Sequence, residues 1–341
     1  MAKRVYCTYF DHHYLTRGLA LYHSLQQHEP GARLWVLCMS EACHRTLTAL
    51  DLPYLRPVRL GEFEAADAEV AATRSSRSMI EYYFTCSPAW KLYVLNNEPD
   101  AEWVTYLDSD LFFFASPEPI YAEMKDASFG IIPHHFTKRE AYRRRFGIYN
   151  VGWVSARRCD EGIAALRWWR ERCIEWCHDF VEGDRFADQR YLDRLPGLFP
   201  NVHVIGHLGA NLAPWNFADL RVEWRDDTVL VEGRFKLLFF HFHGVKHIGR
   251  YYFNSHRVFH APFPELMRQR IYQPYIAALA AAECEVGPYL EDVPVKTIRK
   301  WAIGSPVDHV FNLFRRTRAL AFQGLDILTR RAIVAPSSSA R

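Results

Sequence analysis

The sequence has no long apolar run. None of its apolar stretches approaches the roughly 18 residues that a membrane-spanning helix requires. Its first ten residues lack the apolar core of a signal peptide and have the pattern of a β-strand instead. We therefore expect a protein with neither a signal peptide nor a transmembrane helix.

Closely spaced pairs of cysteines are also missing. The eight cysteines are scattered, and Cys173 and Cys177 lie among tryptophans that favour packing over zinc binding. Free thiols are typical of a reducing compartment. The cysteine pattern therefore predicts a cytoplasmic protein.

The chain carries little net charge, +3, but that charge is unevenly placed. Residues 296–341 contain nine basic residues against two acidic ones, so the rest of the chain is slightly acidic. A protein that binds nucleic acid through a broad basic face is excluded by this distribution. The basic tail predicts contact with an anionic surface, such as the inner face of the plasma membrane.

What the sequence does contain is an alternation of strand and helix patterns. Residues 5–9, 34–38 and 58–60 have strand composition, and residues 15–25 and 42–50 have helical apolar spacing. This order is typical of a mostly parallel α/β sheet. In such sheets ligands bind at the carboxyl ends of the strands, so the ends of separate strands are expected to share one crevice.

Two aspartates follow a further strand pattern. Residues 103–107 include β-branched and aromatic residues, Asp108 and Asp110 come next, and residues 111–114 are apolar again. A buried carboxylate needs a cation or a hydrogen-bond network. The i, i+2 spacing places both side chains on one side of an extended backbone, where their oxygens suit Mg²⁺ or Mn²⁺. A simple strand-ending turn is the competing interpretation.

A second stretch, residues 237–246, ends an apolar run in two histidines. His241 and His243 share one face of the expected strand, and Gly244 follows. A single histidine here would be a satisfied core residue. A pair at this spacing suits a Mn²⁺-type site that also contains carboxylates.

Several other features have both a structural and a functional interpretation. Lys91 lies on an expected helix, either as a solvated residue or as a charge for the site. Residues 133–145 are a basic loop with aromatics, either solvated or a flap over an anionic substrate. Gly152 interrupts a strand, which often marks a close approach of a ligand or another backbone. Asp188 suits the start of a helix, and Trp215 suits either the core or a sugar-stacking platform.

In their order along the chain these motifs resemble the metal-dependent nucleotide-sugar glycosyltransferases of the GT-A fold. The most similar group is glycosyltransferase family 8, which includes glycogenin and bacterial lipopolysaccharide hexosyltransferases. The resemblance extends over residues 5–250 and leaves the last ninety uncovered. It rests on Thr8–Tyr14, Lys91, Asp108-Ser-Asp110, Asn150-Val-Gly152, Asp188-Gln189 and His241–Gly244.

The resemblance implies a Rossmann-like α/β fold with a mixed, mostly parallel sheet flanked by helices. The catalytic domain would span residues 1–260, with a donor half up to about residue 115 and an acceptor half after it. Residues 261–341 would form a basic helical extension. The implied reaction moves a hexose from UDP to a glycan or lipid-linked acceptor in bacterial surface polysaccharide synthesis, with retention of anomeric configuration.

The resemblance also implies a metal site for Mn²⁺ or Mg²⁺. Its ligands would be Asp108, Asp110 and His241, with His243 as the alternative histidine. Asp188 would bind hydroxyl groups of the donor sugar. Gln189 would lie near the anomeric carbon. Lys91 would join Asp188 and Gln189 as a catalytic residue by adding positive charge as the glycosidic bond breaks. The other residues expected to contact the nucleotide-sugar are Thr8, Asp11, Tyr14, Lys91, Asp108 at the ribose, Asn150, Gly152, Gly244 and Lys246.

One motif departs from the family pattern, because Lys246 comes one residue early and His247 occupies the usual lysine position. Two rival interpretations remain. A sugar-nucleotidyltransferase would have a glycine-rich basic loop after the first strand, where this chain has Asp11-His-His-Tyr14. A non-catalytic carbohydrate- or membrane-binding relative would have lost the metal carboxylates, and both are present here.

Overall fold

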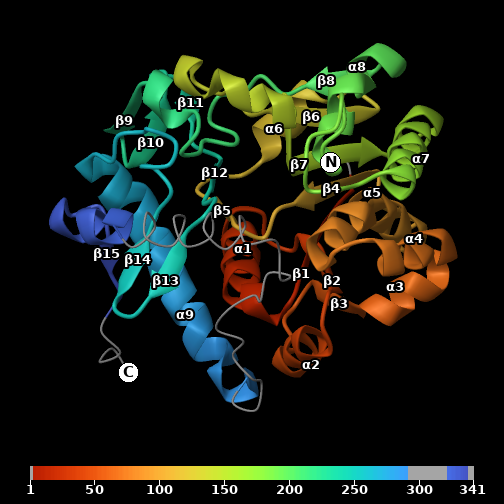
Figure 1. Ribbon diagram of the computed structural model, residues 1–341, viewed down its shortest axis with the longest axis horizontal. Coiled ribbons are helices and arrows are strands. Elements are labelled where there is room, and N and C mark those ends of the chain that lie inside the picture. Colours follow the sequence, from red (N-terminus) through yellow and green to blue (C-terminus); the bar gives the residue numbers. More distant parts are fainter. Residues whose placement is uncertain (1–2, 291–320, 337–341) are drawn as a thin grey trace, which may run out of the picture.

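The computed structural model describes residues 3–290 and 321–336, and its centre is a seven-stranded mixed sheet (Figure 1). The strand order is β3-β2-β1-β4-β7-β6-β8. Only β7 runs against its neighbours in this sheet, so the mixed, mostly parallel arrangement expected from the sequence is confirmed. The strands are β1 (Arg4–Phe10), β2 (Arg33–Cys38), β3 (Leu55–Arg59), β4 (Trp103–Leu107), β6 (Phe129–Pro133), β7 (Tyr149–Arg157) and β8 (Val202–Val204).

The first strands are buried on both faces, which explains their nearly continuous apolar sequence. Val5 and Cys7 of β1 belong to the core on one side of the sheet, and Tyr6 and Phe10 belong to the core on the other. A one-residue shift in pairing would exchange these two sets of side chains, so burial on both faces fixes the register.

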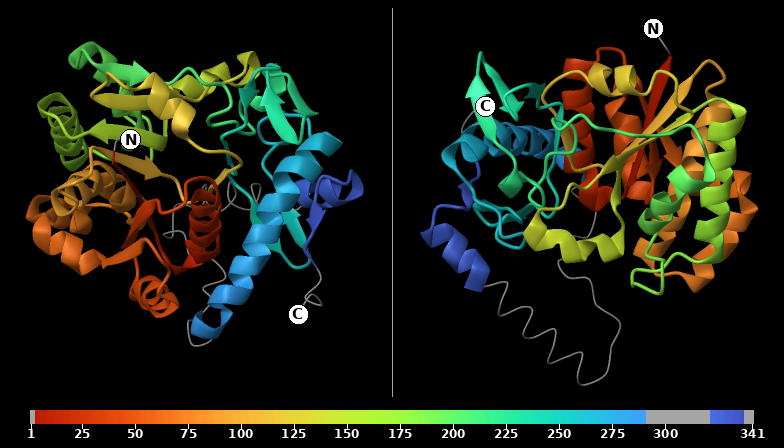
Figure 2. Two further views of the ribbon diagram at one scale, coloured as in Figure 1. Left: turned by 180° about the vertical axis from the view of Figure 1, so that it is seen from behind. Right: turned by 90° about the horizontal axis from the view of Figure 1, so that it is seen from above.

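Helices cover both faces of this sheet (Figure 2). On one side, α5 (Met79–Asn97) packs against α7 (Asp160–Glu175). On the other, α1 (Leu15–His28) packs against the long C-terminal helix α9 (Gln273–Leu290). The shorter helices are α2 (Glu41–Leu50), α3 (Leu60–Ala66), α4 (Ala68–Thr73), α6 (Glu118–Glu123) and α8 (Leu195–Leu198).

Short strands in the second half of the chain build smaller sheets. The most consequential is the pair β5 (Leu111–Phe113) and β12 (Phe239–His241), which are antiparallel and join the aspartate motif to the histidine motif. The other short strands are β9 (Val222–Arg225), β10 (Thr228–Val231), β11 (Phe235–Lys236), β13 (Lys246–Ile248), β14 (Tyr251–Phe253) and β15 (Ile333–Val334).

Some sequence-based expectations are wrong in detail. The basic segment expected as a loop contains a 3-10 helix, η3 (Lys138–Phe146), because the Thr137 side chain caps its first turn. The chain after residue 262 was expected to lack strands, but β15 pairs with β14. The remaining 3-10 segments are η1 (His12–Tyr14), η2 (Arg74–Ser76), η4 (Gln189–Arg194) and η5 (Phe217–Asp219), and a π-helical turn, η6 (Met267–Tyr272), precedes α9.

Much of the basic tail, residues 291–320 and 337–341, lies outside the described residues. Most of the arginines of the tail are therefore not placed, and the domain boundary near residue 260 stays a prediction. In the described part, Arg257 pairs with Asp326 at 2.7 Å. Among the described helices, none combines the length and hydropathy that a bilayer crossing requires.

Candidate active site

A cavity of about 1420 Å³ opens at the carboxyl ends of β1 and β4. Because β7 runs antiparallel, its first residues rather than its last reach this edge. Single-ligand pockets usually measure about 300–1,000 Å³, so this cavity has room for more than one small molecule. Its polar lining includes Asp11, Asp108, Asp110, His134, Arg143, Asn150, Gln189, His241 and His243.

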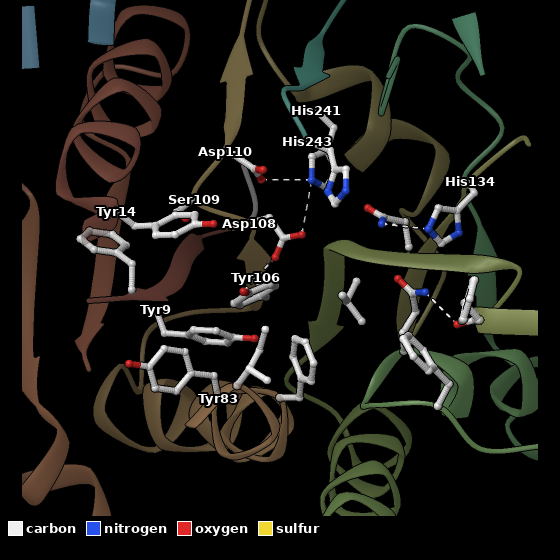
Figure 3. A pocket seen from close by; sticks show the side chains of 18 of the residues that line it. Tyr9, Tyr14, Tyr83, Tyr106, Asp108, Ser109, Asp110, His134, His241 and His243 are labelled. Atoms are coloured by element: carbon white, nitrogen blue, oxygen red, sulfur yellow. Dashed lines mark hydrogen bonds and ion pairs between the residues drawn. The ribbon is translucent and has the colours of Figure 1, made fainter. Parts of the chain in front are cut away.

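The aspartate and histidine motifs converge in this cavity (Figure 3). Ligand atoms of Asp110, His241 and His243 lie within 4.8 Å of one another. His241 Nε2 is 3.0 Å from Asp110 Oδ1 and 3.6 Å from Asp108 Oδ2. The sequence left open which histidine accompanies the aspartates, and both in fact lie beside Asp110.

Burial and the neighbouring charges shift the pKa values of the two aspartates in opposite directions. Burial and the neighbouring Asp110 raise the pKa of Asp108, although Tyr106 donates a hydrogen bond to its Oδ1 at 2.9 Å. For Asp110, burial is outweighed by the charge and hydrogen bond of His241, which lower its pKa to about 2. Burial likewise opposes protonation of His241, but Asp110 raises its pKa. The raised pKa favours a proton on His241 beside Asp110, and a divalent cation that binds Nε2 would displace that proton.

His241 is held from behind by two neighbours. Its Nδ1 lies 3.4 Å from Oδ1 of Asn211, so the carboxamide oxygen accepts the Nδ1 proton and leaves Nε2 facing the aspartates. Gly152 provides the space for the ring, because a Cβ atom there would lie 2.9 Å from His241 Cε1. The close approach predicted for Gly152 is therefore an approach of this imidazole.

Asn150 is fixed by a similar network. Its Oδ1 accepts a hydrogen bond from the Gly152 amide at 3.0 Å, and its Nδ2 lies 3.1 Å from His134 Nε2 (Figure 3). His134 Nδ1 lies 3.1 Å from the carbonyl oxygen of Ile148, so Nδ1 carries the proton and Nε2 accepts. Burial lowers the pKa of His134 to about 3, which keeps the ring neutral.

Lys91 and Asp188 form a buried layer next to the cavity. Lys91 is 0% exposed, donates to the carbonyl and hydroxyl of Ser87 at 3.1 Å, and lies 4.2 Å from the ring centroid of Tyr106, which does line the cavity. Burial lowers the pKa of Lys91 to about 8 and raises that of Asp188 to about 7. Neither residue is among those that line the cavity, and the interpretation of Lys91 as a solvated helix residue is wrong.

Other predicted site residues divide into those that reach the cavity and those that do not. Tyr14 and Gln189 line it, and their contacts with a donor stay predictions. Thr8 is buried within β1, because the strand continues to Phe10 and only then reaches the edge of the sheet. Gly244 forms a left-handed turn after His243, with φ of +75°, and Lys246 is exposed on β13 outside the described cavity lining.

Sequence reasoning assigned no role to three residues that shape the site. Asn211 orients His241, His134 orients Asn150, and Tyr106 binds Asp108. Only Tyr106 carried a usable signal, because it lies two residues before Asp108 and so shares its side of the strand. Trp215 lies edge-on to His241, at 4.9 Å between ring centroids. It lines the cavity, a position that the sugar-stacking interpretation requires.

No family model matches this chain. Among solved structures it is similar to the galactosyltransferase LgtC in complex with donor and acceptor sugar analogs, at 18% identity, a TM-score of 0.48, and coverage of 81% of this chain and 95% of that one. It is also similar to mouse xyloside xylosyltransferase 1, at 14% identity, a TM-score of 0.45 and coverage of 71% and 98%.

Two Bacillus subtilis proteins are closer in sequence. YfnF, described as uncharacterized, is 35% identical over 248 residues, which cover 71% of this chain and 81% of that protein. YfnD, described in the same way, is 32% identical over 298 residues, which cover 86% of this chain and 94% of that protein. The chain therefore belongs to the family of YfnF and YfnD.

Proposed function

We propose that this protein is a metal-dependent glycosyltransferase that uses a nucleotide-sugar donor. The observation that carries the proposal is the convergence of Asp108, Asp110, His241 and His243 in one large cavity at the carboxyl ends of the strands. A UDP-hexose is the favoured donor and a glycan or glycolipid of a bacterial surface polysaccharide the favoured acceptor. We expect retention of anomeric configuration from the motif resemblance.

The donor set fits a divalent cation. Carboxylate oxygens and imidazole nitrogens together suit Mn²⁺, and Mg²⁺ less well because it prefers oxygen alone. Asp110, His241 and His243 would hold the ion, with Asp108 beside them. When bound, the ion neutralises the phosphates of the leaving nucleoside diphosphate and acts as a Lewis acid.

The nucleotide is expected near the end of β1. Tyr9, Asp11, Tyr14 and Tyr83 line the cavity there, and Tyr9 packs against Tyr83 and Tyr106 (Figure 3). Aromatic faces of this kind stack on a nucleobase. The Asp11 carboxylate caps η1 by accepting from the His13 amide at 3.0 Å, and its other oxygen accepts from the Tyr83 hydroxyl at 3.5 Å, a long contact that a ribose hydroxyl would replace.

The sugar is expected between the candidate metal ligands, Asp110, His241 and His243, and β7. Gln189 donates its Nε2 proton to the Phe146 carbonyl at 2.8 Å, an anchor that aims the side chain along the wall where Asn150 also lies. Asp188 and Lys91 lie one layer deeper, so in this structure their contribution to sugar binding is through charge. We propose that donor binding brings Asp188 within reach of the sugar hydroxyls.

A thermal-shift screen tests the proposal. UDP-, GDP- and CMP-sugars are added with and without Mn²⁺, and the expected result is a rise in Tm for a UDP-hexose only when the metal is present. The Asp110→Ala variant should lose this rise, whereas Asp126→Asn, an exposed change far from the motif, should keep it. A protein that responds to none of these donors, or to a sugar phosphate with a nucleoside triphosphate instead, contradicts the proposal.

The basic tail remains part of the proposal as a membrane contact. Residues 296–341 would hold a cytoplasmic enzyme at the anionic inner face of the plasma membrane. Their removal should release the protein from vesicles that contain anionic lipid, and unchanged association would contradict this role.

A further inference from the structure

One wall of the cavity is apolar and open to solvent. Its members come from the first turns of α5, the end of η3, and the segments next to Gln189 and Asn150. They are Met79, Ile80, Phe84, Phe146, Val151 and Phe186, and we call this set the apolar rim. Met79 is 56% exposed although it begins a helix whose middle, residues 85–91, is buried.

Contacts between separate segments hold the apolar rim in place. Phe146 and Phe186 pack against each other from different segments, with ring centroids 4.8 Å apart. The segment before Phe186 is tied to the start of α5, because His178 Nδ1 lies 2.9 Å from Glu81 and Arg77 donates to the Ile174 carbonyl at 3.2 Å. Exposed apolar surface held this firmly beside a cavity marks a place where an apolar ligand binds.

Positive charge adjoins the apolar rim on η3. The Arg145 guanidinium lies 4.7 Å from the ring centroid of Phe146, and among the described residues no carboxylate lies within ion-pair distance of it. Arg143 is different: it lines the cavity but is already paired with the buried Glu140 at 2.6 Å. Arg145 is exposed just outside the cavity lining, and its charge lies beside Phe146, which does line the cavity.

We propose that the acceptor is an anionic amphiphile, a sugar joined through phosphate to a hydrocarbon chain. Its sugar lies toward the candidate metal ligands, and its phosphate faces Arg145. Its hydrocarbon chain lies on Met79, Phe146 and Phe186. This rests on the proposed function for the position of the donor and narrows the acceptor to one chemical class. The size of the cavity supports it, because a nucleotide-sugar alone does not require about 1420 Å³.

Binding of a simple amphiphile tests the inference without any donor. Decyl phosphate, below its micelle concentration, is titrated into the protein by calorimetry, beside inorganic phosphate and uncharged decyl maltoside. We expect saturable binding of one decyl phosphate, at least about tenfold tighter than either comparison ligand, since both the chain and the charge contribute. Equal binding of decyl phosphate and decyl maltoside contradicts the phosphate contact at Arg145.

Matched variants locate the binding. Phe146→Ser and Arg145→Gln should each weaken decyl phosphate binding by about tenfold. The controls are Phe180→Ser, an exposed aromatic outside the cavity lining, and Arg139→Gln on the same 3-10 helix, and both should bind as the parent does. Equal weakening by the controls would mean non-specific adsorption and would overturn the inference.

The outcome is separable from that of the proposed function. A protein that binds UDP-hexose and Mn²⁺ but not decyl phosphate keeps the glycosyltransferase proposal and loses the amphiphile. A protein that binds decyl phosphate at Phe146 and Arg145 but no nucleotide-sugar keeps the site and loses the reaction.

Discussion

Gly152 lies directly beneath the imidazole of His241, so closely that a methyl group at position 152 would be 2.9 Å from Cε1 and 3.0 Å from Nδ1. The two residues come from β7 and β12, which the central sheet and the small β5–β12 sheet bring together. The position of the histidine ligand is therefore set by the absence of a side chain on a strand 89 residues away in sequence.

The first prediction follows from this contact. Gly152→Ala should displace Asn150 Oδ1, which a Cβ would approach to 2.5 Å, and push His241 away from Asp110. Mn²⁺ binding should weaken by roughly 10- to 100-fold, the range seen when the support of a metal ligand is lost. Calorimetric titration with Mn²⁺ measures the change. Gly197→Ala is the control, because a Cβ at Gly197 meets no atom within 4 Å. Unchanged affinity in Gly152→Ala would show that His241 is not a ligand.

The second prediction concerns Asn211, which accepts the Nδ1 proton of His241. Its φ of +60° makes glycine the substitution that removes the side chain without straining the backbone. Asn211→Gly should lower Mn²⁺ affinity by about tenfold while the free energy of unfolding changes less than in a core variant. Asp227→Gly, at φ of +54° in an exposed turn, is the matched control.

The third prediction separates the two aspartates. Asp110 interacts directly with His241 and has a pKa of about 2, whereas the pKa of Asp108 is raised by burial and by Asp110. Asp110→Asn should abolish the Mn²⁺-dependent rise in Tm, and Asp108→Asn should reduce it. A proton count by calorimetry in two buffers checks the link, since the raised pKa of His241 favours a proton that Mn²⁺ binding should release. Binding with no proton release would contradict the imidazolium assignment.

The fourth prediction is a pH dependence of stability at Glu81. Burial alone would raise its pKa, but hydrogen bonds from the Ser78 and Asp179 amides and from His178 lower it to about 2. An unfolded glutamate titrates near 4.3. The stabilising contribution is therefore complete above that value and is lost as the pH falls toward 2.

The measurement for Glu81 is urea unfolding of the parent and Glu81→Gln at several pH values. The variant should be less stable at pH 7 by on the order of 2 kcal/mol, and the difference should shrink below about pH 4.5. Glu41→Gln, whose side chain is 76% exposed, should show no such trend. A difference that stays constant with pH would exclude titration as its source.

Much of the fold could be predicted from the sequence because the first half obeys local rules. The apolar runs of β1 and β2 and the helical spacing of α1 each reflect burial on known faces, and the strand exits identify Asp108 and Asp110. The direction of β7 could not be predicted, because the sequence of a strand does not indicate whether it pairs parallel or antiparallel with its neighbours.

The misplaced site residues have a common physical cause. Lys91 is buried through contacts with Tyr106 of β4 and Trp169 of α7. The sequence of its own helix does not indicate these contacts. Thr8 was expected at a strand exit that comes two residues later. In both cases the motif was aligned with the correct element, and the packing of other elements decided whether the side chain reaches the cavity.

The pairing of β5 with β12 has a consequence for synthesis. The Phe242 amide donates to the Asp110 carbonyl at 2.9 Å, so the segment that bears the aspartate is bonded to a residue made 132 positions later. On the ribosome the aspartates emerge long before either histidine, and a nascent chain that holds only the first sheet strands has no complete cation site. The candidate metal site can form only after β12 has been made, so cation binding would report that β12 has paired with β5.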